Sequence, residues 1–215
     1  MVSVIIPTWN EEASLPETLA ALKNDSETEH EVIVVDGGST DQTIAVARSW
    51  GHQVIESPDR HRAKQMNLGA AKAQGTALWF LHADTEIPQG SLACIESALQ
   101  NDTCVVGGGF ARWFRSTSPF LRLTCLLAQL RSQWFGMYFG DQALYARTST
   151  FRDLGGFEEM PVFEDMDLCQ RLKVHGDLRL LRPAIRTSAR RFDKHGALLI
   201  TLSDLWLTLR YLTNR

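Results

Sequence analysis

Apolar positions in the first hundred residues alternate between short continuous runs and stretches with helical spacing. Continuous apolar runs are typical of strands that are covered on both faces of a sheet. Leu15, Leu19 and Leu22 share one helical face, and residues 63–73 predict a second helix. The predicted strands are 2–7, 31–36, 54–55 and 76–81. This alternation of strands and helices predicts an α/β fold with a mostly parallel central sheet flanked by helices.

The second half of the chain has a less regular pattern. Its predicted strands are 104–110, 139–146 and 178–181, and its predicted helices are 119–135, 164–175 and 197–212. No internal repeat or low-complexity linker separates the two halves. We therefore expect a single domain over residues 1–215.

Composition narrows the classes of function. The chain has 215 residues and a net charge of -3, so overall charge gives no support to a nucleic-acid partner. Its four cysteines are scattered without a CxxC pair, which argues against a zinc site or a disulfide framework. The first residues lack the features of a signal peptide, and no apolar stretch reaches about 18 residues. We expect a cytoplasmic protein.

The motif His82-Ala83-Asp84 follows the apolar run 77–81. Open α/β sheets bind ligands at the carboxyl ends of their strands, where a carboxylate can hold a divalent cation against a phosphate. A turn explains Asp84 equally well, because Asp-Thr before Glu-Ile-Pro is ordinary turn chemistry. The motif alone leaves a metal site and a turn as alternatives.

Two other strand ends carry polar residues that should reach the same edge of the sheet, at 7–11 and 36–39. Asp36 could accept hydrogen bonds from a ribose hydroxyl or a base N–H, or it could form a turn with the two glycines that follow it. Trp9 could be a core anchor. Three such clusters on one edge indicate a binding site more strongly than any one of them.

Residues 60–67 place cations and amides at the start of a predicted helix. Positive side chains and free backbone N–H groups at that position suit a diphosphate, although a solvated basic patch is the alternative. The chain contains neither GxxxxGK[ST] nor GxGxxG, so these phosphate-binding motifs do not compete.

Three clusters in the second half carry candidate chemistry. Glu164 and Asp165 open a predicted helix, where acidic residues either complement the helix dipole or supply a general base. Residues 140–142 place Gly and Asp in a predicted strand, and this local conflict indicates a site. Residues 190–196 collect cations that could neutralise a leaving diphosphate or simply cap the last helix, and a neutral His195 could bind a metal ion.

Together these motifs resemble family 2 glycosyltransferases of the GT-A fold, nearly from end to end. The elements that carry the resemblance are Ile5–Glu11, Val34–Asp41, Leu81–Thr85 and Glu164-Asp165. The segments 62–67, 140–142 and 190–196 resemble, more narrowly, a small bacterial subgroup assigned to arsenosugar biosynthesis. The resemblance implies a nucleotide-sugar-binding half over about residues 1–110. It implies an acceptor half over about residues 111–215, which includes the C-terminal helix.

The resemblance also implies residue roles. Asp165 matches the general base, and Asp84 matches the last carboxylate of the family's DxD motif, a ligand of Mg²⁺ or Mn²⁺. His82 stands where the family has its first Asp, so the motif has one anionic ligand fewer. The expected nucleotide-binding residues are Pro7, Asn10, Glu11, Asp36, Arg62, Asn67 and His82. Further candidates are His195 for the metal, and Asp141, Gln142, Glu164, Arg190 and Arg191 for the acceptor or diphosphate.

The implied reaction transfers a sugar from a nucleotide-diphosphate donor to an acceptor hydroxyl, with inversion and with a divalent cation at the diphosphate. A sugar-nucleotide pyrophosphorylase is a weaker alternative, because Thr8–Glu12 stands where that class has a Gly-rich basic loop. A non-catalytic nucleotide-sugar-binding or membrane-recruitment module is the second alternative.

Two leucine-rich helical segments bear on membrane contact. Their spacing predicts helices that face the core, with contact to a membrane surface as the less favoured alternative. The residues concerned are Phe120, Leu121, Leu123, Leu126, Leu127 and Leu130, together with Leu202, Leu205, Leu209 and Leu212.

Overall fold

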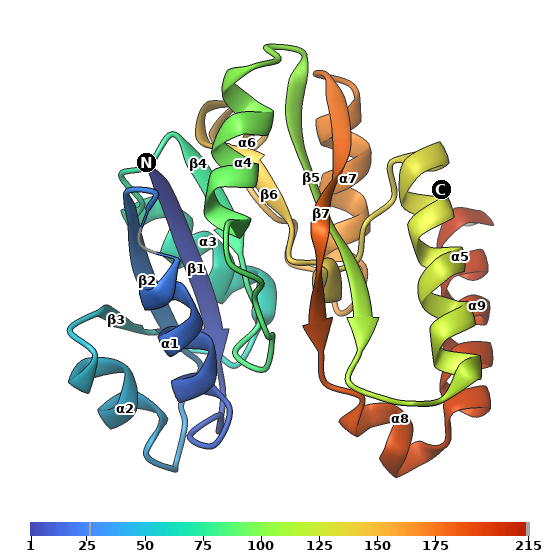
Figure 1. Ribbon diagram of the computed structural model, residues 1–215, viewed down its shortest axis with the longest axis horizontal. Helices are drawn as coiled ribbons and strands as arrows, with labels where there is room; N and C mark the ends of the chain where they lie inside the picture. Colours follow the sequence, from blue (N-terminus) through green and yellow to red (C-terminus); the bar gives the residue numbers. More distant parts are fainter. Residues whose placement is uncertain (26, 214–215) are drawn as a thin grey trace.

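The computed structural model describes residues 1–25 and 27–213. Seven strands in this part of the chain form one sheet in the order β3-β2-β1-β4-β6-β5-β7 (Figure 1). β1 is parallel to β2 and β4, β2 is parallel to β3, and β5 is parallel to β7, whereas β6 is antiparallel to both of its neighbours. The strands are β1 Val2–Thr8, β2 His30–Asp36, β3 Gln53–Glu56, β4 Ala77–Phe80, β5 Val105–Phe114, β6 Tyr145–Arg147 and β7 Asp177–Thr187. The predicted α/β fold with a mostly parallel sheet is confirmed.

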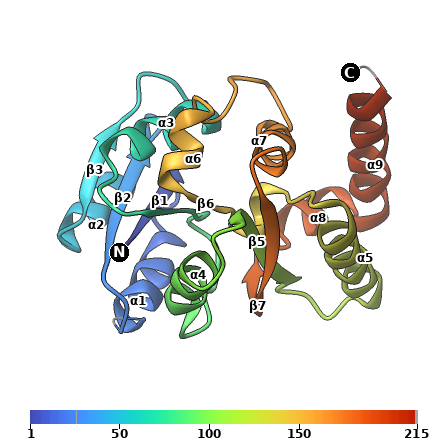
Figure 2. The same cartoon turned by 90° about the horizontal axis from the view of Figure 1, so that it is seen from above.

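Helices cover both faces of this sheet (Figure 2). They are α1 Leu15–Asn24, α2 Thr43–Ser49, α3 Arg62–Lys72, α4 Ser91–Gln100, α5 Pro119–Phe135, α6 Thr148–Asp153, α7 Glu164–Lys173, α8 Arg190–His195 and α9 Ala197–Thr213, with a short 3-10 helix η1 at Gly140–Gln142. Alternate residues of a strand point to opposite faces. Val4 and Ile6 accordingly pack in one core with α1, α2 and α4, and Ile5 packs in a second core with α3, α6 and α7. Burial on both faces explains the continuous apolar runs.

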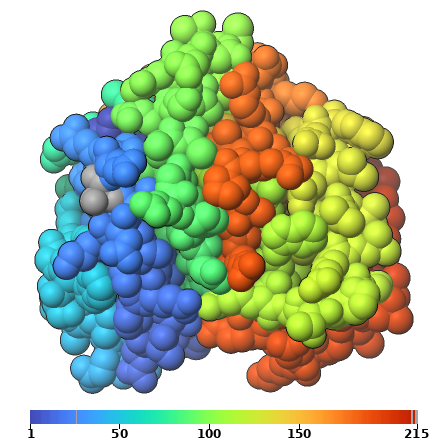
Figure 3. Space-filling view, in the orientation of Figure 1, coloured from blue at the N-terminus to red at the C-terminus, as the bar shows by residue number. Residues whose placement is uncertain are grey.

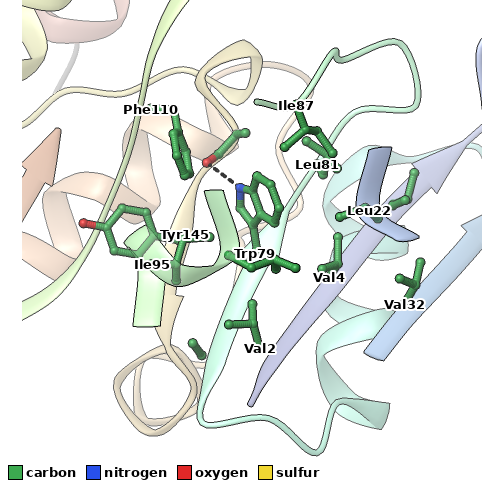
Figure 4. Packing of buried hydrophobic residues seen from close by; sticks show 14 of the residues in the cluster. Val2, Val4, Leu22, Val32, Trp79, Leu81, Ile87, Ile95, Phe110 and Tyr145 are labelled. Atoms are coloured by element: carbon green, nitrogen blue, oxygen red, sulfur yellow. Dashed lines mark hydrogen bonds between the residues drawn. The ribbon is translucent and has the colours of Figure 1, made fainter. Parts of the chain in front are cut away.

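Trp79 lies at the centre of the first core (Figure 4). Its side chain is fully buried, its ring centroid lies 5.5 Å from that of Phe110, and its Nε1 donates a hydrogen bond to the Ala143 carbonyl at 3.2 Å. β4 carries this residue, so the core fixes the strand that leads directly to His82.

The predicted strand 139–146 is wrong over most of its length. Gly140–Gln142 is a 3-10 helix, and β6 begins only at Tyr145. The Gly140 amide donates to the Asp165 carboxylate at 2.5 Å, and the Gln142 side chain bonds the Phe139 amide, so these groups leave the sheet ladder. The other two strands predicted in this half are longer than expected, since β5 continues to Phe114 and β7 to Thr187.

The prediction that the leucine-rich helices face the core is wrong for most of their leucines. Leu121 is buried, but Leu123, Leu126, Leu127 and Leu130 are exposed, as are Leu202, Leu205 and Leu209. The inner face of α5 instead carries the smaller side chains of Cys125, Ala128 and Ser132. The side chain of Leu212 lies outside the described residues. No helix in residues 1–25 and 27–213 is long and apolar enough to cross a membrane.

Candidate active site

A cleft of about 490 Å³ opens beside the carboxyl ends of β1 and β4. Its lining residues come from the loops after these strands, from the start of α3, and from the segment that enters α7. They are Pro7, Thr8, Trp9, Glu11, Arg60, His61, Arg62, Ala63, Gln65, His82, Ala83, Asp84, Met160, Pro161 and Glu164. The edge of the sheet that the sequence predicted as a binding site is therefore hollowed.

Trp9 presents an aromatic surface to this cleft. Its side chain is 38% exposed, and the Arg60 guanidinium carbon lies 3.2 Å from the ring centroid. The alternative that Trp9 is a core anchor is wrong, because the residue follows β1 into the loop instead of continuing the buried strand. An exposed indole next to a cation is suited to stack against a planar base.

Asp36 organises the loop from below the surface. It is fully buried and does not line the cleft. Its Oδ1 accepts from the amides of Gly38 and Ser39, and its Oδ2 accepts from the hydroxyls of Thr8 and Ser39. These bonds form the turn that was the alternative to ribose binding.

Asn10 links the loops that follow β1 and β2. Its backbone amide donates to the Ser39 hydroxyl at 2.8 Å, and its side-chain oxygen accepts from the Thr40 backbone amide at 2.9 Å. Asn10 is outside the cleft lining, next to Trp9. Its structural effect is to hold the loop that presents Trp9 and Glu11.

The first turn of α3 forms one wall of the cleft. His61, Arg62 and Ala63 line the cleft at the point where helical N–H groups have no partner within the helix. This turn contains no acidic residue, so its dipole and its cations favour an anion. Gln65 fixes the helix to the sheet, because its amide nitrogen donates to the carbonyls of Thr8 and Val35, at the ends of β1 and β2.

Arg190 connects two carboxylates across the cleft. Its Nη2 lies 2.9 Å from Asp84 Oδ2 and 3.2 Å from Glu11 Oε1. Asp84 comes from the loop after β4, Glu11 from the loop after β1, and Arg190 from the start of α8. Segments distant in sequence therefore converge on one cation position.

Asp165 lies behind the cleft in a second, much smaller cavity. Arg62, His82 and Glu164 line both spaces, whereas Asp165 lines only the inner one. Gly140 completes its wall, because a Cβ there would lie 3.2 Å from His82 Nε2 and 3.4 Å from Asp165 Oδ2. A Cβ at this position would therefore press on His82 and touch Asp165.

The Asp165 carboxyl is buried and oriented by the backbone. Its oxygens accept from the amides of Gly140 at 2.5 Å and Met166 at 2.7 Å. Burial raises its pKa to about 6, against the opposing effects of Arg62 and of these two amides. A carboxyl of this kind is ionised at neutral pH and is more basic than an exposed aspartate, which suits a general base.

Glu164, His82 and Arg62 form the partition between the two spaces. Glu164 is buried and pairs with Arg62, with Oε1 2.5 Å from Nε. The pKa of His82 is lowered by burial and by the charge of Arg62, which favours a neutral imidazole. His82 is thus suited to hydrogen bonding at the cleft wall.

Positive backbone φ angles occur at three non-glycine positions among the described residues. They are Asn10 in the loop after β1, Ala143 directly after η1, and Phe163 immediately before Glu164. Such conformations are unfavourable for residues with a Cβ, and they persist where the surroundings impose them. All three flank segments that contribute to the two cavities.

Four predicted site residues lie elsewhere. Asn67 exchanges two hydrogen bonds with the backbone of Phe157, and Gln142 is fully buried in a network with Ser132 and Arg131. Arg191 pairs with Asp204 of α9 at 2.6 Å. His195 is exposed at the end of α8.

Asp141 is also outside the cleft lining, and it pairs with the buried Arg112 at 3.0 Å. Its position on η1, between Gly140 and Gln142, gives it a supporting place near the inner cavity. The presence of Gly and Asp in a predicted strand marked this segment as unusual, but it did not predict a 3-10 helix.

The residues fit a divalent cation only in part. No group of three or more His, Cys, Asp or Glu side chains in residues 1–25 and 27–213 has an arrangement that could hold a metal ion. The cleft nevertheless places one cation, the Arg190 guanidinium, between Asp84 and Glu11. Asp84 could therefore hold a cation whose remaining ligands come from a bound phosphate and water.

Several cleft residues were missed as site residues. Met160 and Pro161 come from the segment before α7, which follows no strand, and the neighbouring Glu158 and Glu159 formed no motif that marked a site. Gln65 lies in the basic segment after Arg60, but nothing in the pattern showed that its side chain would bridge two strands. Trp9 had a usable signal, because a large aromatic follows the end of a strand among polar residues.

Comparisons with known proteins match this arrangement. Residues 3–157 match the family model described as "Glycosyl transferase family 2". A PGL/p-HBAD biosynthesis glycosyltransferase of Mycobacterium bovis is 38% identical over 93 residues, which are 40% of this chain and 36% of that protein. The chain thus matches about a third of the length of this curated relative.

Solved structures show the same fold at low sequence identity. The mannosyltransferase PcManGT of Pyrobaculum calidifontis, in complex with GDP-Man and Mn²⁺, has a TM-score of 0.68 and 22% identity, with 86% of this chain and 56% of that chain covered. S. aureus TarS in complex with UDP-GlcNAc has a TM-score of 0.67 and 19% identity, with 87% and 58% covered. The family model spans well over half of the chain, and the chain therefore belongs to glycosyl transferase family 2.

Proposed function

We propose that the protein transfers a sugar from a nucleoside-diphosphate donor to an acceptor hydroxyl. One observation carries the proposal: a cleft lined by cations and carboxylates shares Arg62, His82 and Glu164 with the cavity of a buried carboxyl, Asp165. A donor in the cleft would have its anomeric carbon near that partition. Family membership supports this reaction class.

The donor half of the proposal rests on the chemistry of the cleft wall. The exposed face of Trp9 suits a nucleobase, while Arg60, Arg62 and the first turn of α3 suit the two phosphates. Pro7, Glu11 and His82 complete the wall around the nucleotide, and Asn10 and Asp36 support the loops from behind. Asn67 would act only at a distance, through the Phe157 backbone.

We further propose a divalent cation, Mg²⁺ or Mn²⁺, at Asp84. Two of the structural neighbours were solved with Mn²⁺ and a nucleotide or nucleotide sugar. Bound at Asp84, such a cation would neutralise the charge that develops on the leaving diphosphate. Arg190, which contacts Asp84 directly, is suited to assist the same charge.

Asp165 is the proposed base. Its carboxylate would take the proton from the acceptor hydroxyl as the oxygen attacks the anomeric carbon and the bond to the diphosphate breaks. The two amides that hold Asp165 keep one orientation, and burial keeps it basic. Because a single displacement from the face opposite the leaving group inverts the anomeric carbon, the product should have the inverted configuration.

The acceptor is the least specified partner. The segments 62–67, 140–142 and 190–196 support a narrower proposal, membership of the bacterial subgroup assigned to arsenosugar biosynthesis. The similar mycobacterial proteins are instead described by PGL/p-HBAD biosynthesis. An acceptor panel should therefore contain arsenic-bearing sugars and precursors of the PGL/p-HBAD class.

The donor is tested by thermal shift with UDP-, GDP- and dTDP-sugars, each with and without Mn²⁺. A bound donor raises the apparent melting temperature. A donor concentration of 100 times Kd stabilises the folded protein by about 2.7 kcal/mol. We expect one nucleotide to stand out and its effect to grow with Mn²⁺. No shift with any nucleotide sugar would contradict the proposal.

The base is tested with Asp165→Asn, using Asp153→Asn as a matched control on the exposed end of α6. We expect Asp165→Asn to lower transfer at least 100-fold while the donor Kd changes less than threefold. The control should change neither. Donor binding without hydrolysis or transfer in the wild-type protein would favour the non-catalytic binding module instead.

A further inference from the structure

The helices α5 and α9 expose an unusual amount of apolar side chain. On α5 the exposed residues are Leu123, Leu126, Leu127, Leu130, Trp134 and Phe135, each between 41% and 72% exposed. On α9 they are Leu198, Leu199, Leu202, Leu205, Trp206 and Leu209, each between 54% and 69% exposed. Scattered exposed leucines are ordinary, but a concentration of this size marks an interaction site. We call these twelve residues the α5–α9 apolar surface.

The two helices lie at the same end of the molecule. Figures 1 and 2 both show α5 and α9 at the end opposite β3, and Figure 3 shows α5 forming part of the outer surface there. α8 contacts α9 and joins it to β7. The exposed leucines of both helices therefore belong to one end of the protein.

The orientation of α5 is the reverse of that of an ordinary surface helix. Leu123, Leu126, Leu127, Leu130 and Trp134 recur at the spacing of a single helical stripe, and this stripe faces outward. The buried stripe begins with Leu121, and its other members, Cys125, Ala128, Gln129 and Ser132, are smaller or polar. The more hydrophobic side of the helix is thus the side without a protein partner in residues 1–25 and 27–213.

Charge around this surface selects one kind of partner. α5 contains no acidic residue and exposes Arg122, whereas its Arg131 points inward to Gln142. The only acidic residue of α9, Asp204, pairs with Arg191. Lys194 and Arg210 are exposed nearby in sequence, and Asp193 is the one exposed carboxylate beside them in α8 and α9. The surface is therefore basic at its margins, although the chain as a whole has a net charge of -3.

We propose that the α5–α9 apolar surface binds peripherally to a bilayer that contains anionic lipid. Amphipathic helices with leucine, tryptophan and basic side chains lie in the interface of such membranes, with their apolar face in the acyl region. Anionic headgroups attract the basic margin, and Trp134 and Trp206 are of the type that concentrates at this depth. Each helix has 17 residues, about 25 Å of length, which is consistent with lying along the surface.

A second copy of the chain fits this surface less well. Pairing two such surfaces would bring two basic margins together, and their repulsion would oppose association. Membrane binding has no such cost, because lipid phosphates neutralise the margin. The proposal does not depend on the proposed sugar transfer, although Arg190 of the intervening α8 would bring the cleft close to the lipid.

Vesicle flotation tests the proposal on the whole protein. Vesicles of phosphatidylcholine with about one third phosphatidylglycerol are compared with pure phosphatidylcholine vesicles. We expect the protein to float with the anionic vesicles, several-fold less with the neutral ones, and less as salt rises. Protein that remains unbound with both vesicle types would overturn the proposal.

Variants separate the apolar and basic contributions. Leu127→Glu with Leu205→Glu should reduce vesicle binding at least tenfold, because two exposed leucines lose their apolar contact. Arg122→Gln with Lys194→Gln should reduce binding to anionic vesicles only. Val174→Glu, an 83% exposed apolar residue on the turn after α7, is the matched control and should bind like the wild type.

Self-association through the α5–α9 apolar surface is recognised from the mass of the protein in solution. Light scattering after gel filtration should give a monomer without lipid. A dimer that the Leu127→Glu and Leu205→Glu variant dissociates, together with absent flotation, would assign the surface to self-association and overturn the proposal. Unchanged thermal melting of each variant shows that a loss of binding is not a loss of folding.

Discussion

α1 and α9 both carry leucines at helical spacing, but their surroundings are opposite. Leu15, Leu19 and Leu22 of α1 are fully buried, whereas Leu202, Leu205 and Leu209 of α9 are 54% to 56% exposed. α1 connects β1 to β2 and covers the sheet. α9 comes after β7 and α8 and contacts mainly α8. The comparison teaches that helical periodicity identifies the apolar face but not what covers it.

The same contrast extends to the two regions as wholes. In the first hundred residues, most apolar side chains pack against a helix or strand of the same chain, with Trp9 and Leu68 as the large exposed exceptions. Polar residues are left at the strand ends. At the α5–α9 end, apolar residues remain on the outside. Trp79 in the first region and Trp206 in the second allow a direct test.

Trp79→Ala should destabilise the protein by about 3–5 kcal/mol, because it removes a fully buried ring and leaves a cavity. Trp206→Ala should change stability by less than about 0.5 kcal/mol, since Trp206 is 58% exposed. Urea denaturation of both variants measures the difference. Equal losses would mean that α9 is part of the folding core and would break the comparison.

Arg190 and Arg191 repeat the contrast within one helix. Arg190 pairs with Asp84 and Glu11, which line the cleft, whereas Arg191 pairs with Asp204 on α9. Arg190→Gln should lower transfer by about ten- to a hundredfold, because it removes a charge beside the leaving diphosphate. Arg191→Gln should leave transfer unchanged. A larger effect from Arg191 would contradict the division between cleft and outer surface.

The pH dependence of transfer tests the buried side of the site. The folded pKa of Asp165 is about 6 and its ordinary value is 3.8, so the active carboxylate is lost as pH falls through 6. The value of kcat/KM should drop about tenfold per pH unit below this point. A profile that stays flat down to pH 5 would exclude Asp165 as the base.

The contribution of Asp165 to folding stability should fall as pH rises, whereas transfer should increase. Since the folded carboxyl holds its proton more tightly than the unfolded one, its contribution to stability is fully present below about pH 4 and is lost as pH rises through 6. Asp165→Asn should lack this component. Denaturation of both proteins at pH 4 and pH 7 measures it.

The sequence carried enough information for the sheet and for part of the cleft. Buried strands such as β2 and β4 have continuous apolar runs, and their ends could be aligned because parallel strands share one polar edge. Glu11, Arg62, His82 and Asp84 were found this way. Gln65 and Pro161 were not, because their positions depend on how α3 and the segment before α7 fold against that edge.

Burial also separated residues of the same chemical type. Asp36 and Asp84 both follow strands, yet only Asp84 lines the cleft, because Asp36 is enclosed by its own turn. No local pattern distinguishes these cases. For the same reason, spacing alone could not show that Gly140–Gln142 would leave the sheet and contact Asp165.

The Arg62–Glu164 pair has a consequence for the timing of the reaction. The charge of Arg62 holds the pKa of Asp165 below the value that burial alone would give. A phosphate that pairs with Arg62 would cancel this effect and make Asp165 more basic only when a donor is present. The base would then be weak in the empty enzyme and strong in the loaded one. In that case, the pH midpoint of kcat lies above that of kcat/KM in the same profiles.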